Sequence, residues 1–201
     1  MARRSAPEVN AGSMADIAFL LLIFFLVTTT IPKDSGINRK LPPIEDNQED
    51  VIIKQKNIFT VLLNGKDQLL VEDELMEVKD LRAAAVKFLD NGGDGSCSYC
   101  KGDKDPASSD NPDKAIISLK NERETSYAAY ITVQNELVAA YNELRNRRAL
   151  EVGPPKGFDN MNFVEMQVSY KDPKFIGNKT KLKELIDQIK VEIPQKLSEV
   201  Q

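Results

Sequence analysis

Asp16 is the residue whose type and surroundings point most directly to chemistry. It is the single charged residue between positions 11 and 31, and it directly precedes the uninterrupted apolar run of residues 17–27. Placing a charge deep in an apolar membrane helix costs about 2.5–3.5 kcal/mol, and neutralising an aspartic acid at pH 7 costs about 4 kcal/mol. Because the two costs are similar, small changes in the surroundings decide whether the carboxyl holds its proton. Asp16 is therefore a candidate proton relay.

Cys97 and Cys100 are the second candidate. They lie inside residues 90–114, a loop-like stretch with six Asp, three Lys and four of the chain's ten Gly. Thioredoxin-type redox activity needs such a pair at a strand-to-helix turn, and a Gly- and Asp-rich loop does not provide one. In an oxidising compartment, a local disulfide that staples the loop is favoured. A redox motif and half of an intermolecular metal site remain the alternatives.

Other chemistries have little support in the composition. The 201-residue chain has two Cys and no His, so a four-ligand Cys/His zinc site cannot form within one chain. No nucleophile–base pair, phosphate-binding loop or paired-carboxylate site stands out, and we expect no metal, no cofactor and no enzymatic activity. The 27 Lys and Arg against 31 Asp and Glu give a net charge of −4, which argues against nucleic acid as a partner.

Residues 11–31 predict a single transmembrane helix. At about 1.5 Å per residue they cover about 30 Å, the thickness of a hydrocarbon core. Arg3 and Arg4 precede this segment, which favours a cytoplasmic tail at residues 1–10 and export of the residues after 31. The plainer alternatives are a cleaved signal peptide, a buried helix of a soluble domain, and a position of Asp16 near the headgroups, favoured by the helix dipole.

One face of this helix is expected to pack against another helix. The residues on it follow alternating spacings of three and four, small or polar at one end and mostly aliphatic beyond. Besides Asp16, they are Ser13, Leu20, Ile23, Val27 and Thr30.

The segment NAGSMADIAFLLLIFF at residues 10–25 resembles the N-terminal signature of the ExbD/TolR biopolymer-transport proteins. In that family an Asn lies six residues before an Asp that opens a Leu/Ile/Phe-rich span, as Asn10 and Asp16 do here. The proline usually found between them is absent, and Ser13 occupies its place. The resemblance covers residues 8–42 well and the rest of the chain loosely.

Residues 32–56 are expected to be a flexible linker, and residues 57–201 a small, sandwich-like α/β periplasmic domain with an insertion at about 90–114. The linker segment with Ile37, Leu41 and Pro42 resembles a family segment that can pair with a sheet edge, although an ordinary tether is the favoured explanation. The apolar patterns predict a hairpin over 58–71, helices over 78–89, 125–150 and 182–191, and strands over 115–119, 163–170 and 196–200.

The resemblance implies an ExbD-like subunit of an inner-membrane motor driven by the proton-motive force. Its partners would be a second copy of the chain, polytopic ExbB-like subunits in the membrane, and a TonB-like periplasm-spanning protein that energises outer-membrane transport. One alternative is a TolR-like subunit that maintains the envelope at the peptidoglycan. Another, of a different class, is a membrane-anchored periplasmic thiol-redox or binding module that uses Cys97 and Cys100.

Overall fold

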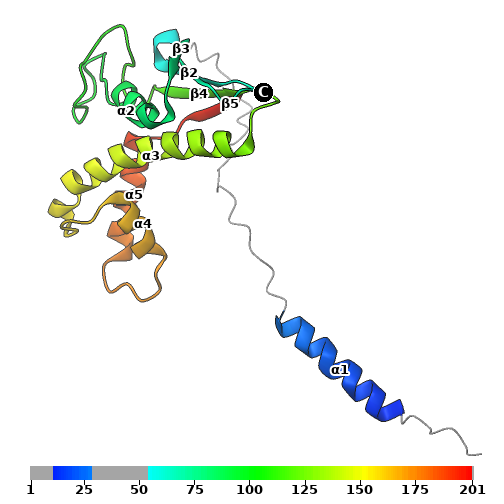
Figure 1. Ribbon diagram of the computed structural model, residues 1–201. Helices are drawn as coiled ribbons and strands as arrows, with labels where there is room; N and C mark the ends of the chain where they lie inside the picture. Colours follow the sequence, from blue (N-terminus) through cyan, green and yellow to red (C-terminus); the bar gives the residue numbers. More distant parts are fainter. Residues whose placement is uncertain (1–10, 29–53, 201) are drawn as a thin grey trace, which may run out of the picture. The chain divides into compact units, whose positions relative to one another are not determined.

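The computed structural model describes residues 11–28 and 54–200 (Figure 1). The chain divides into two compact units, Met1–Glu49 and Asp50–Gln201. Of the described residues, the first unit holds helix α1 (Ala11–Thr28), and the second holds an α/β domain built on a five-stranded sheet. Most of the expected linker lies outside the described residues.

The predicted transmembrane helix over residues 11–31 is wrong for this structure. Helix α1 has 18 residues, which at about 1.5 Å per residue give about 27 Å, less than the roughly 30 Å of a hydrocarbon core. It ends at Thr28, where a run of β-branched threonines with low helix propensity begins. In the part of the chain that the structure describes, no helix has both the length and the apolar content needed to cross a membrane.

The sheet has the strand order β3-β2-β1-β4-β5. The central strand β1 (Ile58–Leu63) is antiparallel to β2 (Leu69–Val71), which is antiparallel to β3 (Glu74–Met76). On the other side, β4 (Ile116–Asn121) is parallel to β1, and β5 (Leu197–Val200) is parallel to β4. The predicted hairpin and the predicted strands near 115–119 and 196–200 are therefore confirmed.

Strand β3 has no counterpart among the sequence predictions. Glu72 and Asp73 form the turn between β2 and β3, and both have positive φ, 50° and 66°. Tight hairpin turns with this backbone are normally signalled by Asn or Gly. Because Glu72 is unusual in such a turn and no Gly follows Asp73, the sequence pattern does not reveal the third strand.

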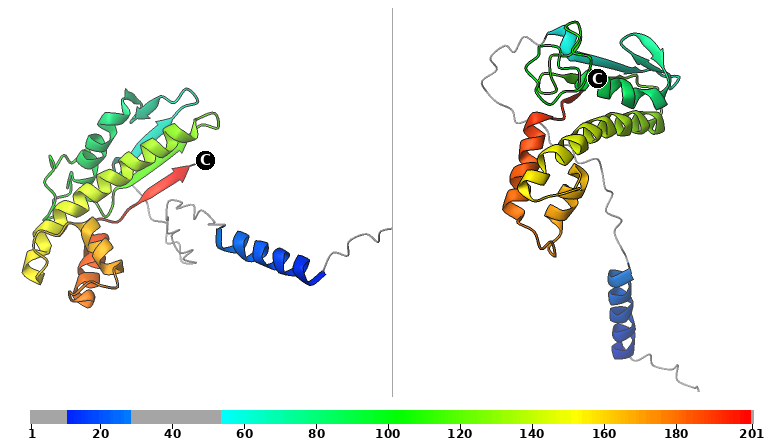
Figure 2. Two further views of the ribbon diagram at one scale, coloured as in Figure 1. Left: turned by 60° about the horizontal axis from the view of Figure 1, so that its bottom comes forward. Right: turned by 90° about the vertical axis from the view of Figure 1, so that its left-hand side faces the viewer.

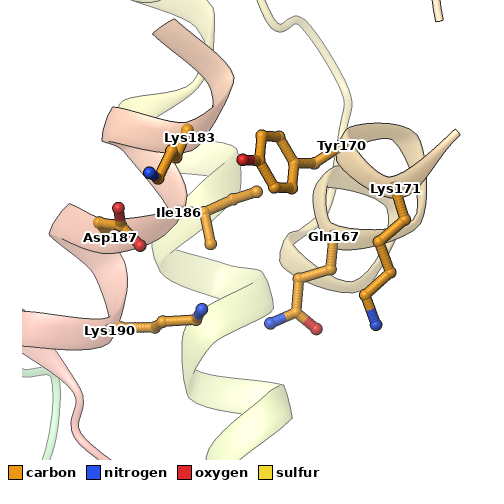
Figure 3. Close-up of a pocket in the computed structure, with 7 residues that line it drawn as sticks. All are labelled: Gln167, Tyr170, Lys171, Lys183, Ile186, Asp187 and Lys190. Atoms are coloured by element: carbon orange, nitrogen blue, oxygen red, sulfur yellow. The ribbon is translucent and has the colours of Figure 1, made fainter. Parts of the chain in front are cut away.

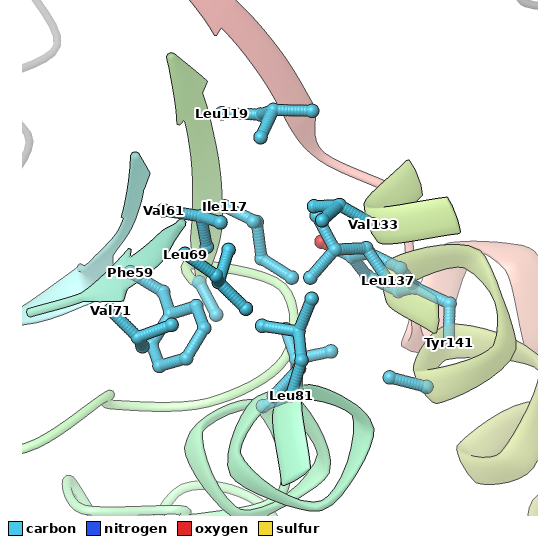
Figure 4. Packing of buried hydrophobic residues seen from close by; sticks show 14 of the residues in the cluster. Phe59, Val61, Leu69, Val71, Leu81, Ile117, Leu119, Val133, Leu137 and Tyr141 are labelled. Carbon is cyan, nitrogen blue, oxygen red and sulfur yellow. The ribbon is translucent and has the colours of Figure 1, made fainter. Parts of the chain in front are cut away.

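Two predicted helices are confirmed as α2 (Val78–Leu89) and α3 (Tyr127–Val152). Both pack on the same hydrophobic core of the sheet (Figure 1). Side chains alternate in and out along β1, so Phe59, Val61 and Leu63 are buried on the core side. Figure 4 shows the helices covering Phe59 and Val61 with Leu81 from α2 and with three residues from α3. These are Val133, Leu137 and Tyr141.

A second apolar cluster joins the C-terminal end of α3 to helices α4 (Phe163–Lys171) and α5 (Lys179–Glu192). Figure 2 shows this helical pair beside α3, apart from the sheet. The buried members are Ala149, Phe158, Phe163, Met166, Leu182, Leu185, Ile186 and Ile189. The domain therefore has two cores, and α3 contributes to both.

The predicted strand over residues 163–170 is wrong, because these residues form helix α4. A capping box begins the helix: the Asn162 side chain accepts a hydrogen bond from the Glu165 N–H, and the Glu165 carboxylate accepts one from the Asn162 N–H. This pair satisfies backbone donors that a helix start leaves open. Local capping therefore outweighs the β-branched and aromatic residues that favoured a strand. The predicted third helix is confirmed as α5.

Asp110 anchors the loop of residues 90–114 to the start of β1. Its side chain is 2% exposed and forms an ion pair with Lys56. The Asn57 amide donates to Oδ2 of Asp110 at 3.2 Å, and the backbone N–H of Asp110 donates to Oδ1 of Asn57 at 2.7 Å. The hydrogen bond from Lys56 holds the pKa of Asp110 below its ordinary value, although burial acts to raise this pKa.

We expect Asp110→Asn to lower the free energy of unfolding by about 2 kcal/mol at pH 7, because a buried, charge-assisted hydrogen bond is lost. Since the folded-state pKa is depressed, this stabilisation is complete above the unfolded-state pKa of about 3.9 and is lost as the pH falls through the lower folded-state pKa. Denaturant titrations from neutral to acidic pH should show that the difference in free energy of unfolding between the wild type and Asp110→Asn becomes smaller below about pH 4. A difference that grows on acidification would contradict this role.

Candidate functional site

Asp16 lies in the second turn of α1, as the sixth residue of the helix. The helix dipole acts mainly within the first turn, and no acidic residue occupies the first turn of α1. All other residues of α1 are uncharged. The carboxyl of Asp16 is therefore an isolated ionisable group on an apolar helix, beyond the position that a helix N-terminus stabilises well.

The side chains of α1 are exposed from residue 11 to residue 25. The large apolar ones among them include Leu22, which is 65% exposed, and Phe19, which is 60% exposed. Soluble proteins rarely expose a contiguous apolar surface of this kind unless it meets a membrane or another protein. Helix α1 is therefore a candidate association surface.

The structure places part of the predicted packing face on α1. Ser13, Asp16, Leu20 and Ile23 follow helical spacing, so they share one side of the helix. Val27 belongs to the helix, but its side chain lies outside the described residues. The remaining predicted positions also lie outside them: Thr30, Ile37, Leu41 and Pro42.

Cys97 and Cys100 are joined by a disulfide, and each is 8% exposed. The pair lies in the loop between α2 and β4 and not at the start of a helix. Tyr99 lies between the two cysteines in the sequence, and its hydroxyl donates to the backbone carbonyl of Glu192 at 2.6 Å. The Arg148 guanidinium lies 4.8 Å from the centre of the Tyr99 ring. This arrangement fastens the loop to α3 and α5 and leaves the sulfurs little access to solvent.

A second anchor of the same loop is the ion pair between Asp90 and Arg147. Two guanidinium nitrogens of Arg147 donate to the Asp90 carboxylate at 2.8 and 2.5 Å. This fork geometry is the strong form of a charge-assisted hydrogen bond, and it raises the pKa of Arg147. Among the described residues, no group of three or more His, Cys, Asp or Glu side chains could hold a metal ion.

We expect the double variant Cys97→Ser, Cys100→Ser to leave the activity of the protein in cells near the wild-type level, because the buried disulfide fastens a loop. The same variant should unfold at a lower denaturant concentration, since the cross-link no longer restricts the unfolded chain. Complementation of a deletion strain and denaturant titration of the purified protein measure the two effects. A loss of complementation as complete as that without the protein would revive the thiol-redox hypothesis.

A pocket of about 320 Å³ opens between α4 and α5 (Figure 3). It was missed at the level of sequence because residues 163–170 were expected to form a strand. The signal that could have found it is the Asn162–Glu165 capping box, which places Gln167, Tyr170 and Lys171 on a helix.

The structure thus combines an exposed apolar helix that carries one carboxyl with a small α/β domain. The chain belongs to the ExbD/TolR family of biopolymer transport proteins, whose family model matches residues 2–147. The resemblance seen in residues 10–25 is thereby confirmed. Members of this family are membrane-associated transport subunits.

The curated relatives include the biopolymer transport protein exbD2 of Vibrio cholerae serotype O1 (strain ATCC 39315 / El Tor Inaba N16961). The two chains are 26% identical over 87 residues, which are 43% of this chain and 62% of that protein. The chain therefore spans less than two thirds of this relative's length. The family match ends within α3, so α4, α5 and β5 lie beyond the matched residues.

Proposed function

We propose that this protein is an ExbD-like subunit of a bacterial inner-membrane motor that uses the proton-motive force to energise a TonB-like protein for outer-membrane transport. The observation that carries the proposal is Asp16, the lone charged residue of the exposed, apolar helix α1. An ionisable group on a membrane-associated apolar helix marks an ion or proton path. Family membership supplies the transport role.

The energetics favour such a relay. Each proton that crosses a potential of 100 mV supplies about 2.3 kcal/mol, and about 1.4 kcal/mol already changes an equilibrium tenfold. Protonation of Asp16 removes a charge from the face that it shares with Leu20 and Ile23. The cycle of charging and neutralising can therefore alternate the packing of α1 between two arrangements.

The proton path requires partner subunits. Within the part of the chain that the structure describes, α1 is the one helix with a continuous apolar surface, and one helix cannot enclose a path. We infer that α1 from two copies of the chain associates with ExbB-like polytopic subunits, which supply the path. The α/β domain would then work in the periplasm, whose oxidising conditions suit the Cys97–Cys100 disulfide.

Co-purification tests this assembly. Tagged full-length protein extracted in detergent should retain a polytopic membrane protein, and Ile23→Lys should lose it because the charge falls on the apolar packing face. Ile176→Lys is the control, since Ile176 is fully exposed in the α/β domain. Elution of the wild-type chain without a membrane partner would overturn the proposal.

Deletion of the protein separates the two family roles. Loss of receptor-dependent uptake with an intact envelope supports the ExbD-like function. Envelope leakage with normal uptake would instead assign the TolR-like role at the peptidoglycan. The buried state of both sulfurs, each 8% exposed, disfavours the thiol-redox alternative.

A further inference from the structure

The pocket between α4 and α5 has the size of a small-molecule site. Its volume is about 320 Å³, and ligand pockets usually start near about 300 Å³. Figure 3 shows side chains of α4 facing those of α5 across the opening, with Ile186 between them. The lining residues are Gln167, Tyr170, Lys171, Lys183, Ile186, Asp187 and Lys190.

The two helices that form the walls are fixed in place by the second apolar cluster. Phe163 and Met166 of α4 and Leu185 of α5 are fully buried in it. Each helix also has a side-chain cap at its start, Asn162 for α4 and Asn178 for α5. The pocket is therefore preformed, and a ligand need not order its walls.

The chemistry of the walls combines positive charge with apolar surface. Lys171, Lys183 and Lys190 contribute three ammonium groups, and Asp187 contributes one carboxylate. Ile186 is 4% exposed and forms the apolar floor, while the Tyr170 ring stands at the rim. The formal charge of the lining is thus +2, on a chain whose net charge is −4.

The lysines of the pocket are available for a ligand. Among the ion pairs of residues 54–200, none includes Lys171, Lys183 or Lys190. By contrast, Lys101 and Lys114 elsewhere in the domain are paired with carboxylates. Several like charges around one opening repel one another, and an anion in the opening relieves this repulsion.

We propose that this pocket binds a small organic phosphate monoester. The two negative charges of a monoester match the +2 charge of the lining, and lysines are common phosphate ligands that act as point charges. The organic part of the ester packs on Ile186 and the Tyr170 ring. The pocket lies on α4 and α5, beyond the residues that match the family.

Calorimetric titration of the full-length protein with phenyl phosphate tests the site. We expect saturable, millimolar binding, with inorganic phosphate weaker because it lacks the ring. Lys183→Gln and Lys190→Gln should each weaken binding about threefold, the range of a partly exposed ion pair. Asp187→Asn should tighten binding about twofold, because a repulsive carboxylate is removed. Lys181→Gln is the matched control on α5 outside the pocket and should leave binding unchanged.

The phosphate ester can belong to a free molecule in solution or to a lipid headgroup. A second experiment therefore measures binding to vesicles of phosphatidylcholine with phosphatidic acid. Vesicle binding that falls in Lys183→Gln but not in Lys181→Gln identifies a lipid source. Binding of phenyl phosphate alone with this dependence identifies a free ester. Equal losses in Lys181→Gln and Lys183→Gln, or no saturable binding in either experiment, would overturn the proposal.

Discussion

Asp16→Asn should abolish transport driven by the proton-motive force while leaving the protein level and the co-purification with membrane partners unchanged. The amide keeps the volume and much of the hydrogen bonding of the carboxyl, but it cannot ionise. The chain contains no His that could take over proton transfer at neutral pH. Because α1 has no other charged residue, the substitution removes its whole charge cycle. Transport measured in cells with normal protein levels is the decisive observation.

Two further variants separate charge from packing. Asp16→Glu should retain partial activity at best, because the added methylene displaces the carboxyl along the packing face. Ser13→Ala changes the same face without touching an ionisable group, and transport should persist. Wild-type transport in Asp16→Asn would remove the main support for a proton-driven motor.

Phe163→Ala should lower the free energy of unfolding by about 3–5 kcal/mol, the usual effect of removing a buried phenylalanine ring. Phe163 is fully buried at the first turn of α4, and the Arg145 guanidinium lies 5.3 Å from its ring centre. Truncation therefore leaves a cavity in the second core and removes a cation–π contact. Val164→Ala is the matched control, since Val164 follows directly on α4 and is 41% exposed. Its effect should stay below about 1 kcal/mol.

Amide hydrogen exchange shows where the loss falls. Because Phe163 belongs to the second cluster and not to the core under the sheet, protection should fall most in α4 and α5. The central strands β1 and β4 should keep theirs. A uniform loss over both cores would show that the two clusters unfold as one unit. An equal effect of Val164→Ala would contradict the role given to the buried Phe163 ring.

Local pattern was sufficient for the elements that carry their own signals. The apolar run of residues 58–63 predicts β1, and the structure confirms it. Helical spacing predicts α2 and the long α3, whose N-cap Ser126 accepts a hydrogen bond from the Ala129 N–H at 3.2 Å. By contrast, the only local signal for β3 is the turn at Glu72 and Asp73. The only local signal for α4 is its capping box. These signals are weaker than the apolar pattern around them.

The candidate functional residues also differ in how far the sequence alone reveals them. Asp16 stands out from sequence because a single charge among apolar residues needs no three-dimensional information to be recognised. The length of its helix does not stand out from sequence, because the described helix has 18 residues where the apolar segment predicted 21. The pocket of α4 and α5 could not be predicted, because it requires both the correct helix and its partner.

The sequence by itself determined the family, the apolar N-terminal helix with its lone carboxyl, and most strands and helices of the α/β domain. These properties depend on residue order over a few turns or strand lengths. The tertiary structure decided the division into two cores, the fastening of the loop at residues 90–114, and the basic pocket. Each depends on residues far apart in the chain, such as Asp90 and Arg147, separated by 57 positions. Burial and charge pairing select such contacts only when the helices and sheet are packed together, because both depend on removing water from the groups that meet.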